Sequence, residues 1–456
     1  MVLETLLMTS VGKKVDADLA VGVPLHPLAG IPIAVKDNIC YDGVPTTAGS
    51  QLLGKHVSPY DADVISALKN CDCVFLGKTN MDEFGMGSTT ETAAAGPTSN
   101  PWNLSRVPGG SSGGSAVAVA SQLCTAALGS DTGGSIRQPA AFCGVVGLKP
   151  TYGAVSRHGL IAYSSSFDTV GPIAQTVADV SYIFDAIRAD RNVRVQRDAS
   201  LRGSDSFKPT FQRASDLVLK PLKGKRFAVI VEAIEEGIST EVRNSFFESI
   251  KHIEELGGAV DVVSCETFRL GLPAYYIIAT SEASSNLARY DGIQMGNTSD
   301  DALNSSNSRR RFMLGEEVRR RILMGTYVLS SGYSDEYYTR AKCAQNGVHN
   351  ELMGYLQDYD ALLTPATPDV AYKMGDNISN PLHMYTGDLL TVNINLAGLP
   401  AVVVQSGLCP VEDGVLPVGL QFIGKHFGEA QLLEMAHVFE TTRCVSLPEV
   451  DLFSWL

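Results

Sequence analysis

Three polar side chains in glycine-rich or strand-like settings have the types and spacing to cleave an amide. Lys36 ends the apolar stretch GIPIAVK, Ser111 lies within PGGSSGGSA, and Ser135 lies within GSDTGGSIRQPA. A serine hydroxyl is a useful nucleophile once an adjacent base takes its proton, and a lysine serves as that base when burial keeps its amine neutral. The pattern predicts Ser135 as the nucleophile, Ser111 as the proton relay and Lys36 as the base.

The turn that precedes Ser135 predicts a place for developing negative charge. Gly133 and Gly134 leave the backbone open to a substrate, because glycine has no side chain to block the approach. Consecutive N–H groups in such a turn can converge on an oxyanion, and one such donor contributes about 3 kcal/mol. We therefore expect Thr132, Gly133 and Gly134 to form the oxyanion loop.

The two glycine- and serine-rich stretches also carry a family resemblance. Residues 108–115 and 129–139 resemble the core of the amidase signature family, and the resemblance extends from about residue 30 to about residue 442. The mechanism in that family uses a Ser–cis-Ser–Lys triad. Ser135 matches the nucleophile, Ser111 the cis serine and Lys36 the base, which implies a cis peptide bond before Ser111.

Further stretches narrow the resemblance to the glutamine-hydrolysing A subunits of glutamyl-tRNA(Gln) amidotransferases; they lie at residues 77–86, 281–287, 317–322, 329–333, 388–391 and 395–400. By this resemblance, Arg321 matches the residue that holds the substrate α-carboxylate, and Asp388 matches the one that receives the α-ammonium. Tyr275 matches a tyrosine that lines the same pocket. A guanidinium suits a carboxylate because its planar fork binds both oxygens.

Each of these substrate roles has an alternative. Arg321 follows Arg319 and Arg320 in a basic run, and such runs are commonly solvated. Asp388 precedes two leucines, where a carboxylate can stabilise a helix N-terminus. A stand-alone amidase acting on small or fatty amides would prefer an apolar pocket at these two positions. A catalytically silent scaffold is the remaining alternative, and the presence of all three triad residues argues against it.

The charge balance limits what this chain does alone. It has 36 basic and 49 acidic side chains and a net charge of −13. That sign is unfavourable for binding tRNA unaided, because affinity for nucleic acids comes mainly from neutralising phosphates. The resemblance implies a division of labour in which this chain hydrolyses glutamine and releases ammonia into an internal tunnel. A partner B subunit would hold Glu-tRNA(Gln) and amidate it with ATP and Mg²⁺, and a small third subunit is expected.

No cofactor and no metal ion is expected in this chain, since its eight histidines include no HExxH pattern. The nine cysteines lack the spacing of a disulfide scaffold, which indicates reduced thiols inside a cell. No run of about 18 apolar residues is present, so no membrane helix is expected. The segment before Lys36 is shorter than in typical members of the family. This favours a mitochondrial protein on the matrix side, with a bacterial cytoplasmic protein as the alternative.

Short apolar runs alternate with helical runs, which is typical of an α/β fold. We expect a single large domain at 30–456 with a mixed, mostly parallel central sheet covered by helices on both faces. Residues 1–29 form a short N-terminal segment, 190–225 a surface excursion and 300–311 a mobile loop. The expected strands are 31–35, 74–77, 125–129, 227–231, 259–263, 361–363, 401–404 and 419–423. The expected helices are 115–122, 177–188, 241–256, 274–290, 316–329, 335–357 and 430–441.

Overall fold

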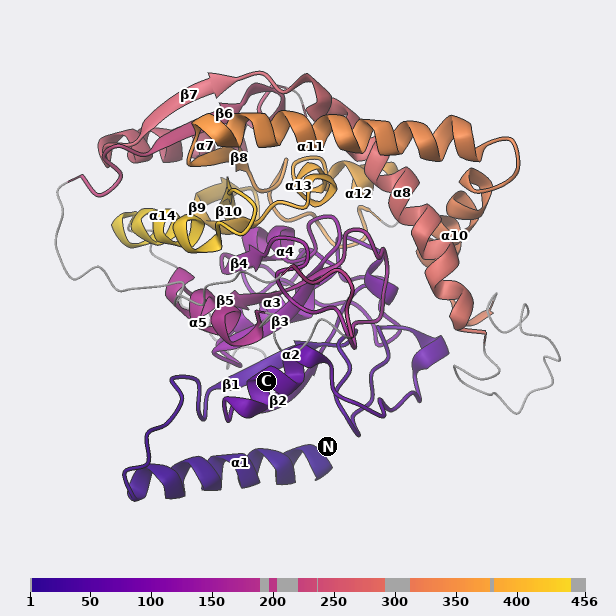
Figure 1. Cartoon of the computed structure of the whole chain (residues 1–456), viewed down its shortest axis with the longest axis vertical. Coiled ribbons are helices and arrows are strands. Elements are labelled where there is room, and N and C mark those ends of the chain that lie inside the picture. The colour runs from indigo at the N-terminus through magenta and orange to yellow at the C-terminus, as the bar shows by residue number, and fades with distance from the viewer. Residues whose placement is uncertain are drawn as a thin grey trace.

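A computed structural model describes residues 2–188, 197–202, 220–235, 237–291, 312–377 and 381–443 of the chain. In this part of the chain, ten strands form one sheet in the order β2-β1-β3-β5-β4-β9-β10-β8-β6-β7. The sheet runs from β2, near α1, to β7 at the opposite end (Figure 1). The strands are β1 (Pro32–Lys36), β2 (Val74–Thr79), β3 (Ala126–Asp131), β4 (Val146–Lys149), β5 (Thr169–Ala174), β6 (Arg226–Ile230), β7 (Ala259–Val263), β8 (Ala361–Pro365), β9 (Ala401–Val411) and β10 (Gly414–Ile423).

The sheet is mixed, as expected, but parallel pairing is confined to its two ends. Strand β1 pairs in parallel with β2 and β3, and β6 pairs in parallel with β7 and β8. The strands between these groups pair antiparallel from β3 through to β8. Parallel pairing is therefore less dominant than the sequence predicted. Three of the antiparallel pairs involve β4 or β5, which the strand pattern did not reveal. The other two join β10 to β9 and to β8, strands that were predicted without their direction.

Helices cover both faces of the sheet, as predicted. Side chains alternate between the faces of a strand. In β1, Ile33 and Val35 join one buried cluster, whereas Ala34 joins a second cluster on the other side. Helices α2, α5, α7 and α14 pack on the first face, and α3, α4, α8, α11 and α13 pack on the second. A core on each side makes the sheet a rigid base for the residues at its edge.

The α-helices of the described residues have the following bounds: α1 (Val2–Ala20), α2 (Asp63–Asn70), α3 (Gly113–Ala120), α4 (Arg137–Cys143), α5 (Val177–Ile187), α7 (Thr240–Glu255), α8 (Gly271–Asn286), α10 (Glu316–Val328), α11 (Arg340–Asp358), α12 (Pro381–Thr386), α13 (Val392–Ala397) and α14 (Glu429–Thr442). The seven predicted helices and the eight predicted strands are all present; β9 extends seven residues beyond its predicted end, and the other ends shift by at most five. The predicted helix at 335–357 begins as a π-helical turn, Asp335–Thr339, before α11.

The elements that the sequence did not reveal lack a regular pattern. All seven residues of α4 are buried, so this helix has no polar face to mark its period. Strand β5 contains Gly171 and Pro172, two residues that usually argue against a central strand. Within the predicted N-terminal segment 1–29, α1 lies beside β2 (Figure 1), where Lys14 pairs with Asp72 at 2.6 Å.

Two predicted segments fall largely outside the described part of the chain. The mobile loop at 300–311 lies wholly outside it. Of the surface excursion at 190–225, only residues 197–202 and 220–225 are described. Both assignments stay predictions.

Candidate active site

The lysine predicted as the base is placed by the parallel pairing at one end of the sheet. Strands β1 and β3 run in the same direction, so their carboxyl ends meet at one edge. Lys36 is the last residue of β1, and Ser130 lies near the end of β3. The Lys36 side chain is completely buried. Its aliphatic part crosses the protein interior and its amine ends among hydroxyl groups.

The Lys36 amine contacts three serines. Its Nζ lies 2.7 Å from Ser111 Oγ, 2.8 Å from Ser112 Oγ and 2.9 Å from Ser130 Oγ. The Ser130 carbonyl oxygen is 3.2 Å away. The Ser112 hydroxyl donates to that same carbonyl at 3.1 Å, so its oxygen is left to accept from the lysine. Ser112 Oγ and the carbonyl can take the two hydrogens of a neutral amine, which leaves its lone pair for the Ser111 hydroxyl.

Burial favours the neutral amine that this arrangement needs. Desolvation lowers the pKa of Lys36 from 10.5 to about 7, although the nearby carboxylates of Asp82, Asp131 and Asp168 act to raise it. Burial outweighs them because removing an ammonium from water is costly. Lys36 is therefore partly deprotonated near neutral pH and can accept a proton.

The turn that carries Ser111 has the cis peptide bond that the family resemblance implies, between Gly110 and Ser111. Neighbouring side chains hold this turn in place. The Thr90 hydroxyl donates to the Gly109 carbonyl at 2.7 Å, and Gln138 Oε1 accepts the Gly110 N–H at 3.0 Å. The Ser111 hydroxyl is thereby fixed against the lysine.

Ser135 lies on the adjoining turn, just before α4. Its carbonyl oxygen accepts the Ser112 N–H at 3.1 Å, which ties the two serine turns together. Ser135 is 8% exposed, and its hydroxyl makes no hydrogen bond within the described ranges. The structure therefore joins Lys36 to Ser111 and places Ser135 on the neighbouring turn, without a hydrogen bond between the two serine hydroxyls.

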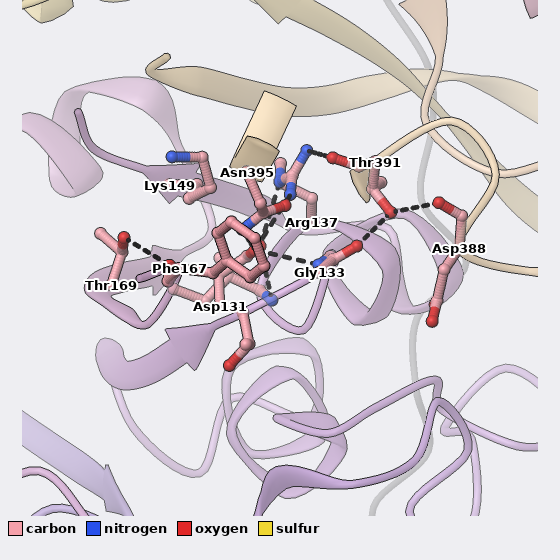
Figure 2. A network of polar contacts seen from close by, with 12 residues as sticks. Asp131, Gly133, Arg137, Lys149, Phe167, Thr169, Asp388, Thr391 and Asn395 are labelled. Carbon is pink, nitrogen blue, oxygen red and sulfur yellow. Dashed lines mark hydrogen bonds and ion pairs between the residues drawn. The ribbon is translucent and has the colours of Figure 1, made fainter. Parts of the chain in front are cut away.

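A buried ion pair shapes the turn between β3 and Ser135 (Figure 2). The Arg137 guanidinium binds both oxygens of the Asp131 carboxylate, at 2.9 and 3.0 Å, and both side chains are inaccessible to solvent. Burial alone would raise the pKa of Asp131, but Arg137 holds this pKa below its usual range. The same carboxylate accepts the N–H groups of Gly134 at 2.9 Å and Ile136 at 3.1 Å.

This ion pair changes the donor set of the predicted oxyanion loop. The Gly134 N–H already donates to Asp131. The N–H groups of Thr132, Gly133 and Ser135 have no acceptor among the described residues. The structure therefore leaves the N–H groups on either side of Gly134, rather than that of Gly134 itself, available to an oxyanion.

The predicted carboxylate-binding residue is buried, so the solvated alternative for Arg321 is wrong. Arg321 is 2% exposed on α10, whereas Arg319 is exposed. Its Nε donates to Glu317 Oε1 at 2.7 Å, and its Nη1 donates to the Tyr163 hydroxyl at 2.9 Å. Its Nη2 is buried and has no partner within the described ranges. The guanidinium keeps one donor free, as a site for a carboxylate requires.

Asp388 is linked to Arg321 through Tyr276 and is also buried. Its Oδ1 accepts from the Ser88 hydroxyl at 2.9 Å and its Oδ2 from the Tyr276 hydroxyl at 2.7 Å. Burial raises the pKa of Asp388 to about 6, and Arg321 opposes this rise. The Tyr276 ring lies 5.2 Å from the Arg321 guanidinium, so this one side chain contacts both charged groups.

Tyr275 lies against the turn that carries Ser135 and packs on Tyr276. A Cβ atom placed on Gly133 would lie 2.5 Å from the Tyr275 hydroxyl, so the tip of this ring abuts the turn. The Tyr275 ring also packs on Phe167 at 5.7 Å and on Tyr276 at 5.1 Å. The structure thus gathers all nine residues predicted from the sequence around one site.

Several residues of the site were missed by sequence reasoning. Some had a local signal: Ser112 adjoins Ser111, Tyr276 adjoins Tyr275, and Glu317 lies four residues before Arg321, where a helix brings two charges together. Ser130 and Thr391 lie within the stretches 129–139 and 388–391 that carry the resemblance, although neither was assigned a role. Others had no local signal, because only the fold brings them in from distant segments; these are Ser88, Tyr163 and Asp168.

The described residues contain no group of three His, Cys, Asp or Glu side chains that could hold a metal ion. Within the same residues, no helix has the length and apolar character needed to cross a membrane.

Comparisons with known proteins agree with this geometry. The family described as Amidase matches residues 8–433. The A subunit of a chloroplastic/mitochondrial glutamyl-tRNA(Gln) amidotransferase from Arabidopsis thaliana is 49% identical over 432 residues, which is 94% of this chain and 80% of that one. The A subunit of the glutamyl-tRNA(Gln) amidotransferase from Heliobacterium modesticaldum is 47% identical over 437 residues, covering 95% of this chain and 87% of that one.

Solved structures give the same answer. The crystal structure of the A subunit of the glutamyl-tRNA(Gln) amidotransferase from Thermotoga maritima matches with a TM-score of 0.76 and 40% identity, covering 93% of this chain and 88% of that one. A peptide amidase from Stenotrophomonas maltophilia matches with a TM-score of 0.76 and 29% identity, over 97% of this chain and 89% of that one. With its serine–serine–lysine site and a family match over most of its length, this chain belongs to the amidase family.

Proposed function

We propose that this chain is the glutaminase subunit of a glutamyl-tRNA(Gln) amidotransferase. The observation that carries the proposal is the pair of opposite charges beside the Ser135 turn. Arg321 offers a buried donor with no partner within the described ranges, and Asp388 offers a buried carboxylate. Free glutamine is a zwitterion and needs one cation and one anion, whereas a neutral amide would leave both charges buried without a ligand.

The residues around Ser135 support a balanced acyl transfer. Ser135 Oγ attacks the side-chain amide carbon of glutamine, while its proton passes to Ser111 and the Ser111 proton passes to Lys36. The Ser111–Ser135 contact forms as the substrate binds, since catalytic hydrogen bonds commonly tighten in that complex. Free N–H groups of the turn stabilise the oxyanion, each by about 3 kcal/mol. The protonated base then supplies the proton with which ammonia leaves, and water hydrolyses the glutamyl ester.

The rest of the reaction belongs to a heteromeric complex. A B subunit, joined by a small third subunit, holds Glu-tRNA(Gln) and activates the glutamate with ATP and Mg²⁺. Ammonia reaches it from this chain through an internal tunnel, and this chain itself needs no cofactor. The organellar and bacterial relatives support a mitochondrial matrix location, with a bacterial cytoplasm as the alternative.

The test is to compare amide substrates with the purified chain and its copurifying partners. Glutamine should be hydrolysed far faster than propionamide or a fatty amide, and Ser135→Ala should abolish the activity. Ser121→Ala is the matched control, because the Ser121 hydroxyl is buried with no hydrogen bond to any described residue and follows the end of α3 that is remote from Ser111. A glutamine-derived diazoketone should label Ser135, as read by mass spectrometry. Faster turnover of neutral amides, with no partner subunit copurifying, would refute the proposal.

A further inference from the structure

Two threonine hydroxyls hold the oxyanion turn from opposite sides. The Thr132 hydroxyl donates to Asp168 Oδ1 at 2.7 Å. The Thr391 hydroxyl donates to the Gly133 carbonyl at 2.5 Å and lies 3.1 Å from the Asp388 carbonyl. A hydroxyl has one hydrogen, so the shorter contact, to Gly133, is the one it makes. Neither threonine is part of the triad or of the charged pair.

The hydrogen bond from Thr132 to Asp168 is the first of two bridges, and it connects the oxyanion turn to the Arg321 guanidinium. Asp168 is buried, and besides Thr132 it accepts the backbone N–H groups of Tyr163 at 2.9 Å and Ser164 at 3.1 Å. The hydroxyl of Tyr163 in turn accepts from Arg321 Nη1 at 2.9 Å. Arg321 is therefore linked through a short chain of buried hydrogen bonds to the first residue of the turn.

The hydrogen bond from Thr391 to the Gly133 carbonyl is the second bridge, and it connects the turn to the Asp388 carboxylate. Thr391 follows Asp388 by three residues, and its N–H donates to the Asp388 carbonyl at 3.1 Å. Its hydroxyl lies between the carbonyls of Asp388 and Gly133 (Figure 2). Thr391 also fixes the peptide group between Gly133 and Gly134. The carbonyl of that group accepts from Thr391, and its N–H donates to Asp131 at 2.9 Å. With both ends bound, this peptide plane cannot rotate, which sets the directions of the N–H groups on either side of it.

We propose that Thr132 and Thr391 are positioning residues that couple the two charged ends of the substrate pocket to the oxyanion turn. This inference rests on the proposed function, in which a zwitterionic amino acid occupies both ends. Thr132 transmits the position of Arg321, and Thr391 transmits that of Asp388. A substrate held at both ends thereby meets N–H groups that already point at its amide oxygen. The two hydroxyls act on the turnover rate, while Arg321 and Asp388 supply the affinity.

The test separates turnover from binding. Thr132→Val and Thr391→Val keep the side-chain shape but remove the hydroxyl, and each should lower the kcat for glutamine by about tenfold to hundredfold, the effect of misplaced catalytic groups. The glutamine Kd, measured by calorimetry in a Ser135→Ala background, should change by less than about threefold, a difference of under 1 kcal/mol. Thr132→Ser and Thr391→Ser restore the hydroxyl and should restore kcat.

Controls make each outcome decisive. Thr367→Val removes another buried threonine hydroxyl, which donates to the Asp369 carbonyl, and should leave kcat unchanged. Should a valine variant fail to fold, the alanine variant carries the same expectation. A wild-type kcat in the valine or alanine variants overturns the inference, and so does a serine variant as impaired as the valine one. A fall in glutamine affinity as large as the fall in kcat would also overturn the inference, because it would show that the threonines only stabilise the structure. Propionamide is assayed beside glutamine to separate this inference from the proposed function. A wild-type chain that prefers propionamide refutes the proposed function. The kcat of the variants on propionamide then tests whether Thr132 and Thr391 position the oxyanion turn.

Discussion

The pKa of Lys36 links the chemistry of the site to the stability of the fold. Because the lysine acts as a base only when neutral, kcat/KM for glutamine should rise with pH and level off above the lysine pKa. Burial lowers that pKa from 10.5 to about 7. We therefore expect the acid limb of the pH profile to have its midpoint near pH 7, and Lys36→Met to be inactive at every pH.

The same shift fixes the sign and size of a stability effect. Between pH 7 and 10.5 the unfolded chain holds a proton on Lys36 that the folded chain has lost. The free energy of unfolding contributed by this residue therefore rises with pH across that window, by about 1.4 kcal/mol per pH unit and about 5 kcal/mol in all. Lys36→Met removes the titration. The stability of the wild type relative to the variant should thus improve steadily from about pH 7.5 to about pH 9.5.

Urea denaturation of both proteins across this pH range measures the slope, and glutamine hydrolysis measures the kinetic midpoint. Lys149→Met is the matched control, because Lys149 is buried as well and desolvation also lowers its pKa to about 7. The stability of the wild type relative to Lys149→Met should rise with pH by a similar amount. The pH profile of glutamine hydrolysis by Lys149→Met should nevertheless keep its acid limb near pH 7. A flat stability difference between wild type and Lys36→Met, or an acid limb that Lys149→Met abolishes, would refute the assignment of the base.

Three further predictions concern the charged groups. Arg321→Lys should weaken glutamine binding by about 1–3 kcal/mol in calorimetry on a Ser135→Ala background, because lysine lacks the free planar donor, while ammonium-supported amidation by the complex stays intact. Asp131→Asn should lower the free energy of unfolding in urea by about 3–5 kcal/mol, since it leaves the buried Arg137 guanidinium uncompensated. Glutamine binding should weaken as the pH falls through 6 and stay constant between about pH 7 and 8, because the pKa of Asp388 is raised to about 6 and protonation removes the anion that receives the ammonium group.

The sequence predicted the reacting residues better than the helices and strands that hold them in place. Lys36, Ser111 and Ser135 lie in short motifs whose residue types indicate amide cleavage. These motifs belong to a family resemblance that extends over most of the chain. The elements between them were harder to predict. Strand β5 was missed because Gly171 and Pro172 break its pattern, and α4 because complete burial removes the polar face that marks a helix. Both are stabilised by their surroundings rather than by local preference.

The roles of single polar groups depended on contacts that no local pattern reveals. The Gly134 N–H was predicted as an oxyanion donor, and only the folded structure shows that Asp131 already accepts it. Arg321 could have been solvated with its neighbours, and only the packing of α10 buries it. In each case the deciding partner comes from elsewhere in the fold or from the three-dimensional course of a turn, so residue type alone leaves the outcome open.

Burial explains how Lys36 can work as a base among carboxylates. Asp82, Asp131 and Asp168 all act to raise the pKa of Lys36, and uncompensated they would favour the ammonium form. Arg137 compensates Asp131 by binding both its oxygens. Burial raises the pKa of Asp168 to about 6 and also raises the pKa of Asp82. Both carboxylates therefore begin to lose their negative charge at a higher pH than usual. Burial still outweighs the three carboxylates, so the Lys36 amine is partly neutral near pH 7. Asp131 ends β3, which pairs in parallel with β1, so the ion pair of the oxyanion turn and the lysine lie at the same edge of the sheet.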